Sequence, residues 1–139
     1  MQAKKCGSKW ILRIDKGEEV VATLRDFCDS RGVRLASVSG IGAADTVVIG
    51  YFETAAKKYH TLERTGDHEI TNLSGTVSTM GGQVYLHLHI TLSDPNGQAF
   101  GGHLSSALVS GTCEIVLDPI EGEVDRELSQ EVGLNLLKL

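Results

Sequence analysis

The chain has 139 residues, 41% of them hydrophobic and 22% charged, with 16 glycines, two prolines and a formal net charge of −5. This length supports one domain with a sizeable core, and the abundant aliphatic residues exclude long disordered stretches. No apolar run approaches the roughly 20 residues of a membrane-spanning helix. The first ten residues contain three lysines but no apolar run, so we expect no signal peptide. The acidic balance, without a basic stripe, argues against direct binding of DNA.

Three cysteines, Cys6, Cys28 and Cys113, are an odd number with no C-x-x-C pair. This is not a disulfide framework, and it predicts a reducing, cytoplasmic compartment. Cys28 lies on the apolar face of a predicted helix and Cys113 in a predicted strand. We expect both to be small buried hydrophobic residues.

The first elements are a short strand and one amphipathic helix. Alternation over Trp10–Ile14 predicts the strand, which ends at Asp15-Lys16-Gly17. A helical period then predicts a helix over Glu18–Arg31, with acidic residues in its first turn and Gly32 as its stop. Its apolar stripe comprises Val20, Val21, Leu24, Phe27 and Cys28.

The segment from Leu35 to Leu117 is predicted to be nearly all strand. Turn-forming sequences interrupt it at 40–42, 65–67, 81–82 and 95–97. Residues 105–110 fit a second short helix or a crossover, and 126–139 a short helix or a C-terminal strand. Short connections favour antiparallel neighbours, so the predicted class is α+β: a single domain in which one main helix packs on a bent antiparallel sheet of about seven strands. The candidate strands are Val33–Ser39, Thr46–Thr54, Lys58–Arg64, Glu69–Met80, Gln83–Ser93, Gln98–Leu104 and Thr112–Asp118.

A glycine-rich segment, Ser39–Asp45, begins like a dinucleotide-binding G-x-G loop. The third glycine is replaced by Asp45, and a β-branched run follows where a helix should hold the pyrophosphate. We therefore interpret these glycines as a bend or bulge between strands.

The most informative segment is the predicted strand Val84–Ser93. Its even-numbered positions are all aliphatic, so His87 and His89 project together from the opposite face. Their Cα atoms are expected roughly 6.5–7 Å apart, close enough for two imidazoles to reach one ion.

The following turn predicts where a third histidine lies. Pro95-Asn96 suits a type I turn and Gly97 the left-handed position, so that Asp94 pairs with Gln98. His89 then lies opposite His103, unless the glycines at 101 and 102 introduce a bulge. Three such histidines can supply three ligands of a tetrahedral zinc site. The alternative is a polar sheet face or an oligomer interface.

The two remaining histidines, His60 and His68, have no such companions, and we expect both at the surface. Each ring of the three-histidine group should be oriented by a carboxylate or carbonyl partner.

The stretch HLHITLSDPNGQAFGGHL, followed by LVSGTCEIVL, resembles the plants-and-prokaryotes-conserved (PPC) domain. SGIGAAD with VVIGYF, EITNLSGTV and the C-terminal VDREL…EVGLNLLKL also match. The resemblance covers almost the whole chain, with a domain core of about residues 8–137.

The resemblance implies an α+β domain of about seven antiparallel strands that assembles as a homotrimer. It implies that His87, His89 and His103 are metal ligands, as in stand-alone prokaryotic members. Plant members carry AT-hooks, Arg-Gly-Arg-Pro motifs that bind the DNA minor groove, and prokaryotic members are described by analogy as DNA-binding. This chain has no AT-hook.

The residues and the resemblance together leave three alternative functions. The first is a homotrimeric binding or scaffold module that holds a divalent metal, zinc being favoured. The second is a metal-dependent hydrolase, for which Asp94 and Glu114 are candidate general bases. The third is a DNA-binding regulator.

Overall fold

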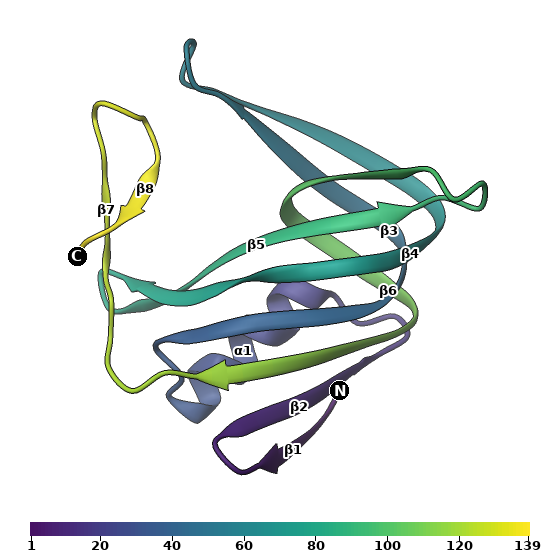
Figure 1. Cartoon of the computed structure of the whole chain (residues 1–139), viewed down its shortest axis with the longest axis horizontal. Helices are drawn as coiled ribbons and strands as arrows, with labels where there is room; N and C mark the ends of the chain where they lie inside the picture. Colours follow the sequence, from purple (N-terminus) through teal and green to yellow (C-terminus); the bar gives the residue numbers. More distant parts are fainter.

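The computed structural model describes all 139 residues as one six-stranded sheet, one two-stranded sheet and a single helix (Figure 1). All strand pairings are antiparallel, which confirms the predicted α+β class. The elements in chain order are β1 (Gln2–Cys6), β2 (Lys9–Asp15), α1 (Val20–Arg31), β3 (Ala36–Glu53), β4 (Lys58–Met80), β5 (Gln83–Ser93), β6 (Ala99–Pro119), β7 (Arg126–Leu128) and β8 (Asn135–Leu137).

The large sheet is strongly bent, as predicted. Its strand order is β1-β2-β6-β3-β4-β5, and β5 also pairs with β6. The four strands from β3 to β6 therefore each pair with two of the others, and the sheet curls until its last strand meets β6 (Figure 1). This closure pairs the last residues of β5, His89–Ser93, with the first residues of β6, Ala99–His103.

Three breaks predicted between strands, at 40–42, 65–67 and 105–110, are wrong, because β3, β4 and β6 each run through them without interruption. β3 passes through the glycine segment with register shifts at Gly40/Gly42 and Ala44/Thr46, so the predicted bulge exists but lies inside one strand. A Cβ on Gly40 would lie 2.7 Å from the carbonyl oxygen of Glu114, which explains the glycine by close backbone approach. β4 likewise continues through 65–67, where Gly66 has a φ of +100°.

Residues 105–110 form neither a short helix nor a crossover. They are the middle of β6, where Ala107 pairs with Val47 of β3. The ambiguous C-terminus folds as the β7–β8 hairpin, so the strand alternative holds and the helix alternative is wrong. β1, which pairs with β2, was not predicted.

The helix has the predicted apolar stripe, and all five of its residues are buried. It begins at Val20 rather than Glu18, so neither glutamate lies in the first turn. Glu19 instead caps the helix, since its carboxylate accepts hydrogen bonds from the backbone N–H groups of Val21 (3.0 Å) and Ala22 (2.6 Å). Gly32 ends the helix in the left-handed conformation, with a φ of +64°.

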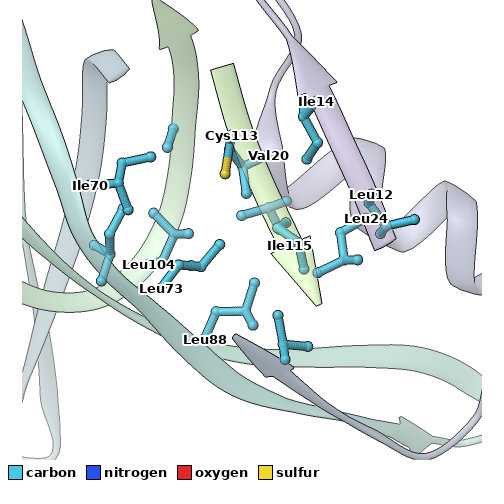
Figure 2. Packing of buried hydrophobic residues seen from close by; sticks show 14 of the residues in the cluster. Leu12, Ile14, Val20, Leu24, Ile70, Leu73, Leu88, Leu104, Cys113 and Ile115 are labelled. Atoms are coloured by element: carbon cyan, nitrogen blue, oxygen red, sulfur yellow. The ribbon is translucent and has the colours of Figure 1, made fainter. Parts of the chain in front are cut away.

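The hydrophobic core lies between α1 and the curled sheet (Figures 1 and 2). The aliphatic face predicted for β5 points into it: Leu88, Ile90, Leu92 and Val84 are buried, and Leu86 is partly buried against the same cluster. The opposite face of β5 is thereby free to present its histidines. Cys28 and Cys113 are buried and unpaired, as expected, and burial raises the pKa of their thiols to about 12 and about 11.

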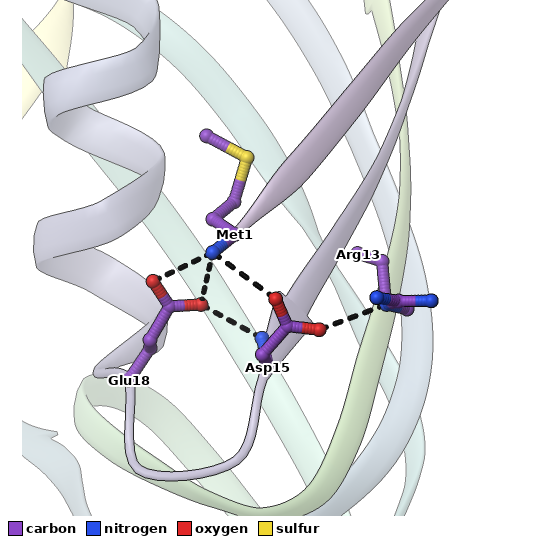
Figure 3. A network of polar contacts seen from close by, with 4 residues as sticks. All are labelled: Met1, Arg13, Asp15 and Glu18. Carbon is purple, nitrogen blue, oxygen red and sulfur yellow. Dashed lines mark hydrogen bonds and ion pairs between the residues drawn. The ribbon is translucent and has the colours of Figure 1, made fainter.

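A polar network joins the start of β1 to the β2–α1 connection (Figure 3). The Met1 amino group forms ion pairs with Glu18 (2.7 Å) and Asp15 (3.2 Å), and Asp15 also pairs with Arg13. These contacts raise the pKa of the amino group and lower that of both carboxyls, chiefly through hydrogen bonds between the side chains. Because the groups are solvent-accessible, the network orients β1 more than it stabilises the fold.

The twelve-residue α1 is the only helix, and nothing in the structure forms a helix long and apolar enough to cross a membrane.

Candidate metal site

The β5–β6 hairpin has the predicted loop. The backbone N–H of Asp94 donates to the carbonyl of Gln98 (3.0 Å), and the N–H of Gly97 donates back to Asp94 (2.9 Å). Gly97 has the left-handed φ of +77°. The Asp94 carboxylate accepts from the N–H groups of Gln98 and Asn96, each at 2.9 Å, and these hydrogen bonds lower its pKa. Turn chemistry alone therefore sets the hairpin register.

The register places His89 directly opposite His103. Gly101 and Gly102 introduce no shift, since Ile90 pairs with Gly102 and Thr91 with Gly101. A Cβ on Gly101 would collide with the carbonyl oxygen of Ile90. Gly101 thus permits close approach of β5 and β6, and Gly102 permits close approach to the carbonyl of Gly50 in β3. Neither creates the bulge considered from sequence.

The three histidine rings form one cluster. The ring centroid of His87 lies 5.3 Å from the centroid of His89 and 5.3 Å from that of His103. The centroids of His89 and His103 are 5.6 Å apart. One ligand atom from each ring lies within 4.8 Å of the other two. Each residue comes from a strand whose position is fixed by backbone pairing, so the cluster is preorganised by the sheet.

Burial tunes the cluster toward the neutral imidazole. It lowers the pKa of His87, with further lowering by the charges of Arg126 and His89, and it lowers the pKa of His103, with help from His87 and His89. Neutral imidazole is the form that binds metal ions. None of the three rings forms a hydrogen bond with another residue, so the carboxylate or carbonyl partner expected for each ring is not found.

A pocket of about 710 Å³ opens over the histidines. Its walls come from β3, β4, β5 and β6 on one side and from the β7–β8 hairpin on the other. Aromatic and aliphatic side chains contribute much of the wall, among them Phe52, Tyr85 and Leu136. No aspartate or glutamate lines the pocket.

Tyr59 closes one side of the histidine cluster. Its ring meets His103 edge-on with centroids 5.8 Å apart, and burial raises the pKa of its hydroxyl. The ring lies against Gly50, where any Cβ would collide with it. Gly50 is therefore required for Tyr59 to reach His103.

Arg126, the first residue of β7, supplies the positive charge of the pocket. It is buried, 7% exposed, and its Nε donates to the Ser78 hydroxyl (2.8 Å) while one terminal nitrogen donates to the carbonyl of Asn135 (2.8 Å). The guanidinium also lies over the ring of Tyr85, 4.8 Å from its centroid. These contacts hold the β7–β8 hairpin against β4 and β5.

The other candidate residues lie elsewhere. Asp94 and Glu114, the two candidate general bases, do not line the pocket, and Asp94 is engaged in its own turn. His60 is exposed, as expected, and pairs with Glu53 at 3.0 Å. The surface position expected for His68 is wrong: it is 8% exposed and packs edge-on against Phe100 because β4 continues inward past Gly66.

Three pocket residues were not predicted from the sequence: Arg126, Tyr59 and Asn135. Arg126 stands among Glu123, Asp125 and Glu127, a pattern typical of a solvated surface. Tyr59 is an aromatic residue near the end of an exposed hairpin arm. The return of the C-terminal hairpin to β4 brings Arg126 and Asn135 beside the histidines, and the pairing of β3 with β4 places Tyr59 there.

A bent antiparallel sheet with one covering helix and a three-histidine pocket at the β5–β6 hairpin defines a small α+β domain with the donor set of a metal-binding protein. The family model of the Plants and Prokaryotes Conserved (PCC) domain matches residues 1–121. The chain belongs to this family, which is the PPC family of the sequence resemblance.

Solved structures agree with this assignment. The fold is similar to a candidate DNA-binding protein from Bacteroides thetaiotaomicron (36% identity, TM-score 0.96, covering 99% of this chain and 96% of the other). It is also similar to a metal-containing protein from Archaeoglobus fulgidus (34% identity, TM-score 0.90, covering 97% of this chain and 96% of the other). A third similar structure is a plant- and prokaryote-conserved protein from Pyrococcus horikoshii (29% identity, TM-score 0.87, covering 99% of this chain and 94% of the other).

Among curated proteins, 62 residues are 44% identical to a bifunctional GlmU protein from a Synechococcus strain. The match covers 40% of this chain and 9% of that protein.

Proposed function

We propose that the chain binds one divalent metal ion, zinc, through His87, His89 and His103, and that it serves as a binding or scaffold module. The observation that carries this proposal is the convergence of three imidazoles, with ligand atoms within 4.8 Å, on a pocket where none of them has another hydrogen-bond partner. Three neutral imidazoles suit zinc and leave a fourth position for water or an exogenous ligand.

The similarity to a metal-containing protein supports the proposal, because that protein shares 34% identity over nearly the whole chain. Bound zinc would act as a Lewis acid toward an oxygen or nitrogen of a ligand in the pocket. The part played by this chain is to hold three ligands on paired strands, to favour the neutral form of His87 and His103 by burial, and to limit access through the β7–β8 hairpin.

A binding role is favoured over hydrolysis by the composition of the pocket. A hydrolytic site needs a general base within hydrogen-bond reach of the attacking water. No carboxylate lines the pocket, and the two candidates from sequence lie outside it.

We further propose that the chain assembles as a homotrimer in the reducing cytoplasm. Three exposed apolar residues, Ile11, Ile41 and Val116, line one shallow depression on the outer face of the sheet. Exposed patches of this kind mark protein contacts. The reducing setting is supported by three free cysteines, two of them buried.

The experiment that tests the metal site is elemental analysis of untagged protein, followed by zinc titration of the stripped protein. We expect one zinc per chain, and a rise in melting temperature on adding zinc. His89→Gln should abolish zinc binding and the rise in melting temperature. His60→Gln removes an exposed histidine outside the cluster and should change neither the binding nor the melting temperature. Stripped wild-type protein that neither binds zinc nor melts higher with it would defeat the proposal.

A further inference from the structure

Arg126 is a buried cation that lacks an anionic partner. It takes part in none of the ion pairs of the chain, although it is only 7% exposed. The nearest acidic residues in sequence are otherwise engaged: Asp125 accepts a hydrogen bond from Thr79 (3.0 Å), and Glu127 pairs with Lys138 (3.6 Å). A guanidinium keeps its charge in proteins, and burying a charge without a counter-ion is costly.

Hydrogen bonds within the chain use only part of the guanidinium. One N–H donates to Ser78 and one to the carbonyl of Asn135, both neutral acceptors. A guanidinium has five N–H donors, so unused donors remain on a group that lines the pocket. Ser78, Asn135 and the Tyr85 ring hold this group in a fixed orientation, which favours bidentate pairing with a planar oxyanion.

The rest of the pocket is suited to the body of an organic molecule. Its volume of about 710 Å³ falls in the range of small-molecule sites. Aromatic side chains from β3 and β4 face leucines of the C-terminal hairpin, among them Phe52, Tyr59 and Leu136. No acidic side chain lines the pocket to repel an anion.

We propose that this pocket binds a small organic anion, an acid with an aromatic or aliphatic body, whose carboxylate or phosphate pairs with Arg126. A second oxygen or nitrogen of the same molecule takes the open position on the metal; this half of the proposal rests on the proposed function. Arg126 lies beyond residues 1–121, the part that the family model matches, so the anion site belongs to the C-terminal hairpin of this chain.

The test is calorimetric titration of the full chain, first stripped of metal and then loaded with zinc. The probes are benzoate, phenyl phosphate and benzyl alcohol, which share a ring but differ in charge. We expect both acids to bind the stripped protein at least tenfold more tightly than the alcohol. Zinc should further tighten phenyl phosphate, which keeps an oxygen for the metal after pairing with Arg126, and should affect benzoate less, because both of its oxygens pair with Arg126. Comparison of benzoate with phenyl phosphate then distinguishes the two kinds of acid.

Arg126→Gln should remove the preference for acids, whereas Arg13→Gln, which removes an exposed arginine far from the pocket, should leave it intact. Because Arg126 also anchors the hairpin, a second readout uses wild-type protein. The Nε–H resonance of Arg126 should shift with benzoate and stay in place with benzyl alcohol.

The proposal is overturned if the stripped protein binds the acids no better than the alcohol, or if Arg126→Gln retains the preference. If zinc binds but does not tighten the binding of phenyl phosphate, the bridging half of the proposal alone is overturned. Failure of zinc to bind at all defeats the proposed function, yet the stripped protein still decides the role of Arg126.

Discussion

His89 and His103 are direct cross-strand partners, and their rings stand perpendicular with centroids 5.6 Å apart. The five-residue turn between β5 and β6 fixes this pairing, since a one-residue slip would move one ring to the opposite face. His87, two residues before His89 on the same face, completes the cluster. The site therefore depends on turn geometry and strand period rather than on long-range packing.

The first prediction concerns pH. Zinc affinity should fall as pH drops through the ordinary histidine range near 6.5, because the ligands must be neutral. The lowered pKa of His87 and His103 in the folded chain moves the protonation of these two ligands to lower pH. Competition titrations with a chelator between pH 5 and 8 measure this. An affinity that already declines above pH 7 would contradict it.

The lowered pKa of His87 and His103 also determines how the stability of the metal-free protein changes with pH. Below pH 6.5 the unfolded chain binds protons on these histidines more readily than the folded chain does. The metal-free protein therefore has the full contribution of the two neutral rings above pH 6.5 and loses it as pH falls. Both groups are partly exposed, so the loss should be modest, and His60→Gln should not alter it.

The sequence predicted well that the three histidines lie together, because local rules determine their positions. Alternation along Val84–Ser93 assigns the faces of β5, and the Asp94–Gln98 turn assigns the register. The same local rules failed at Ser105–Ser110, which they assign to a short helix or a crossover, and at Gly40 and Gly66, which they assign to interruptions between strands. There the glycines serve bulges and close backbone approach within long strands, which depends on neighbours distant in sequence.

The pocket wall lies outside what local rules can predict. Arg126 reaches Ser78 across 48 residues of sequence, and no turn or period links the two. His68 shows the same limit, since its burial depends on Phe100 of β6.

The second prediction concerns the core face of β5. Leu88 is 1% exposed, and truncation of a buried leucine costs about 2–5 kcal/mol. Leu88→Ala should lower the free energy of unfolding by this amount in denaturant titrations, and Leu88→Asp should prevent folding. Leu139→Ala, at a fully exposed position, is the matched control and should change nothing. A soluble Leu88→Asp protein with a cooperative melt would show that the face is wrongly assigned.

The third prediction concerns the cap of α1. Glu19 accepts from two helix N–H groups and also from the N–H of Ala107 in β6 (2.9 Å), so it joins the helix to the sheet. Glu19→Ala should cost about 1–2 kcal/mol of stability, because it removes a cap and leaves Ala107 without its acceptor. Asp26→Ala removes the same charge from the exposed face of α1 and should have little effect. Equal melting temperatures for the two variants would refute the capping role.

The fourth prediction concerns assembly. Light scattering of the wild-type protein should give about 45 kDa, three times the 14.9 kDa chain. Ile41→Lys places a charge on the exposed apolar depression, where Ile41 is 59% exposed, and should shift the mass toward the monomer without unfolding the chain. Leu128→Lys, at another exposed apolar position, should keep the trimer. A wild-type mass near 15 kDa would rule out the trimer.

The last prediction is that the chain does not bind DNA specifically at physiological salt. Its formal charge is −5, and one basic depression is lined by Lys5, Arg31 and Arg34 together with Trp10. Asp29 already neutralises Arg34 at 2.9 Å, and Arg31 lies over the Trp10 ring, 5.2 Å from its centroid. A site with so few free cations can release few counter-ions from the DNA backbone, so binding should be weak. Fluorescence anisotropy with duplex DNA over a range of salt concentrations measures this. Sub-micromolar affinity that falls steeply with salt, and that Arg31→Gln weakens, would refute the prediction and assign the phosphate contacts to this depression.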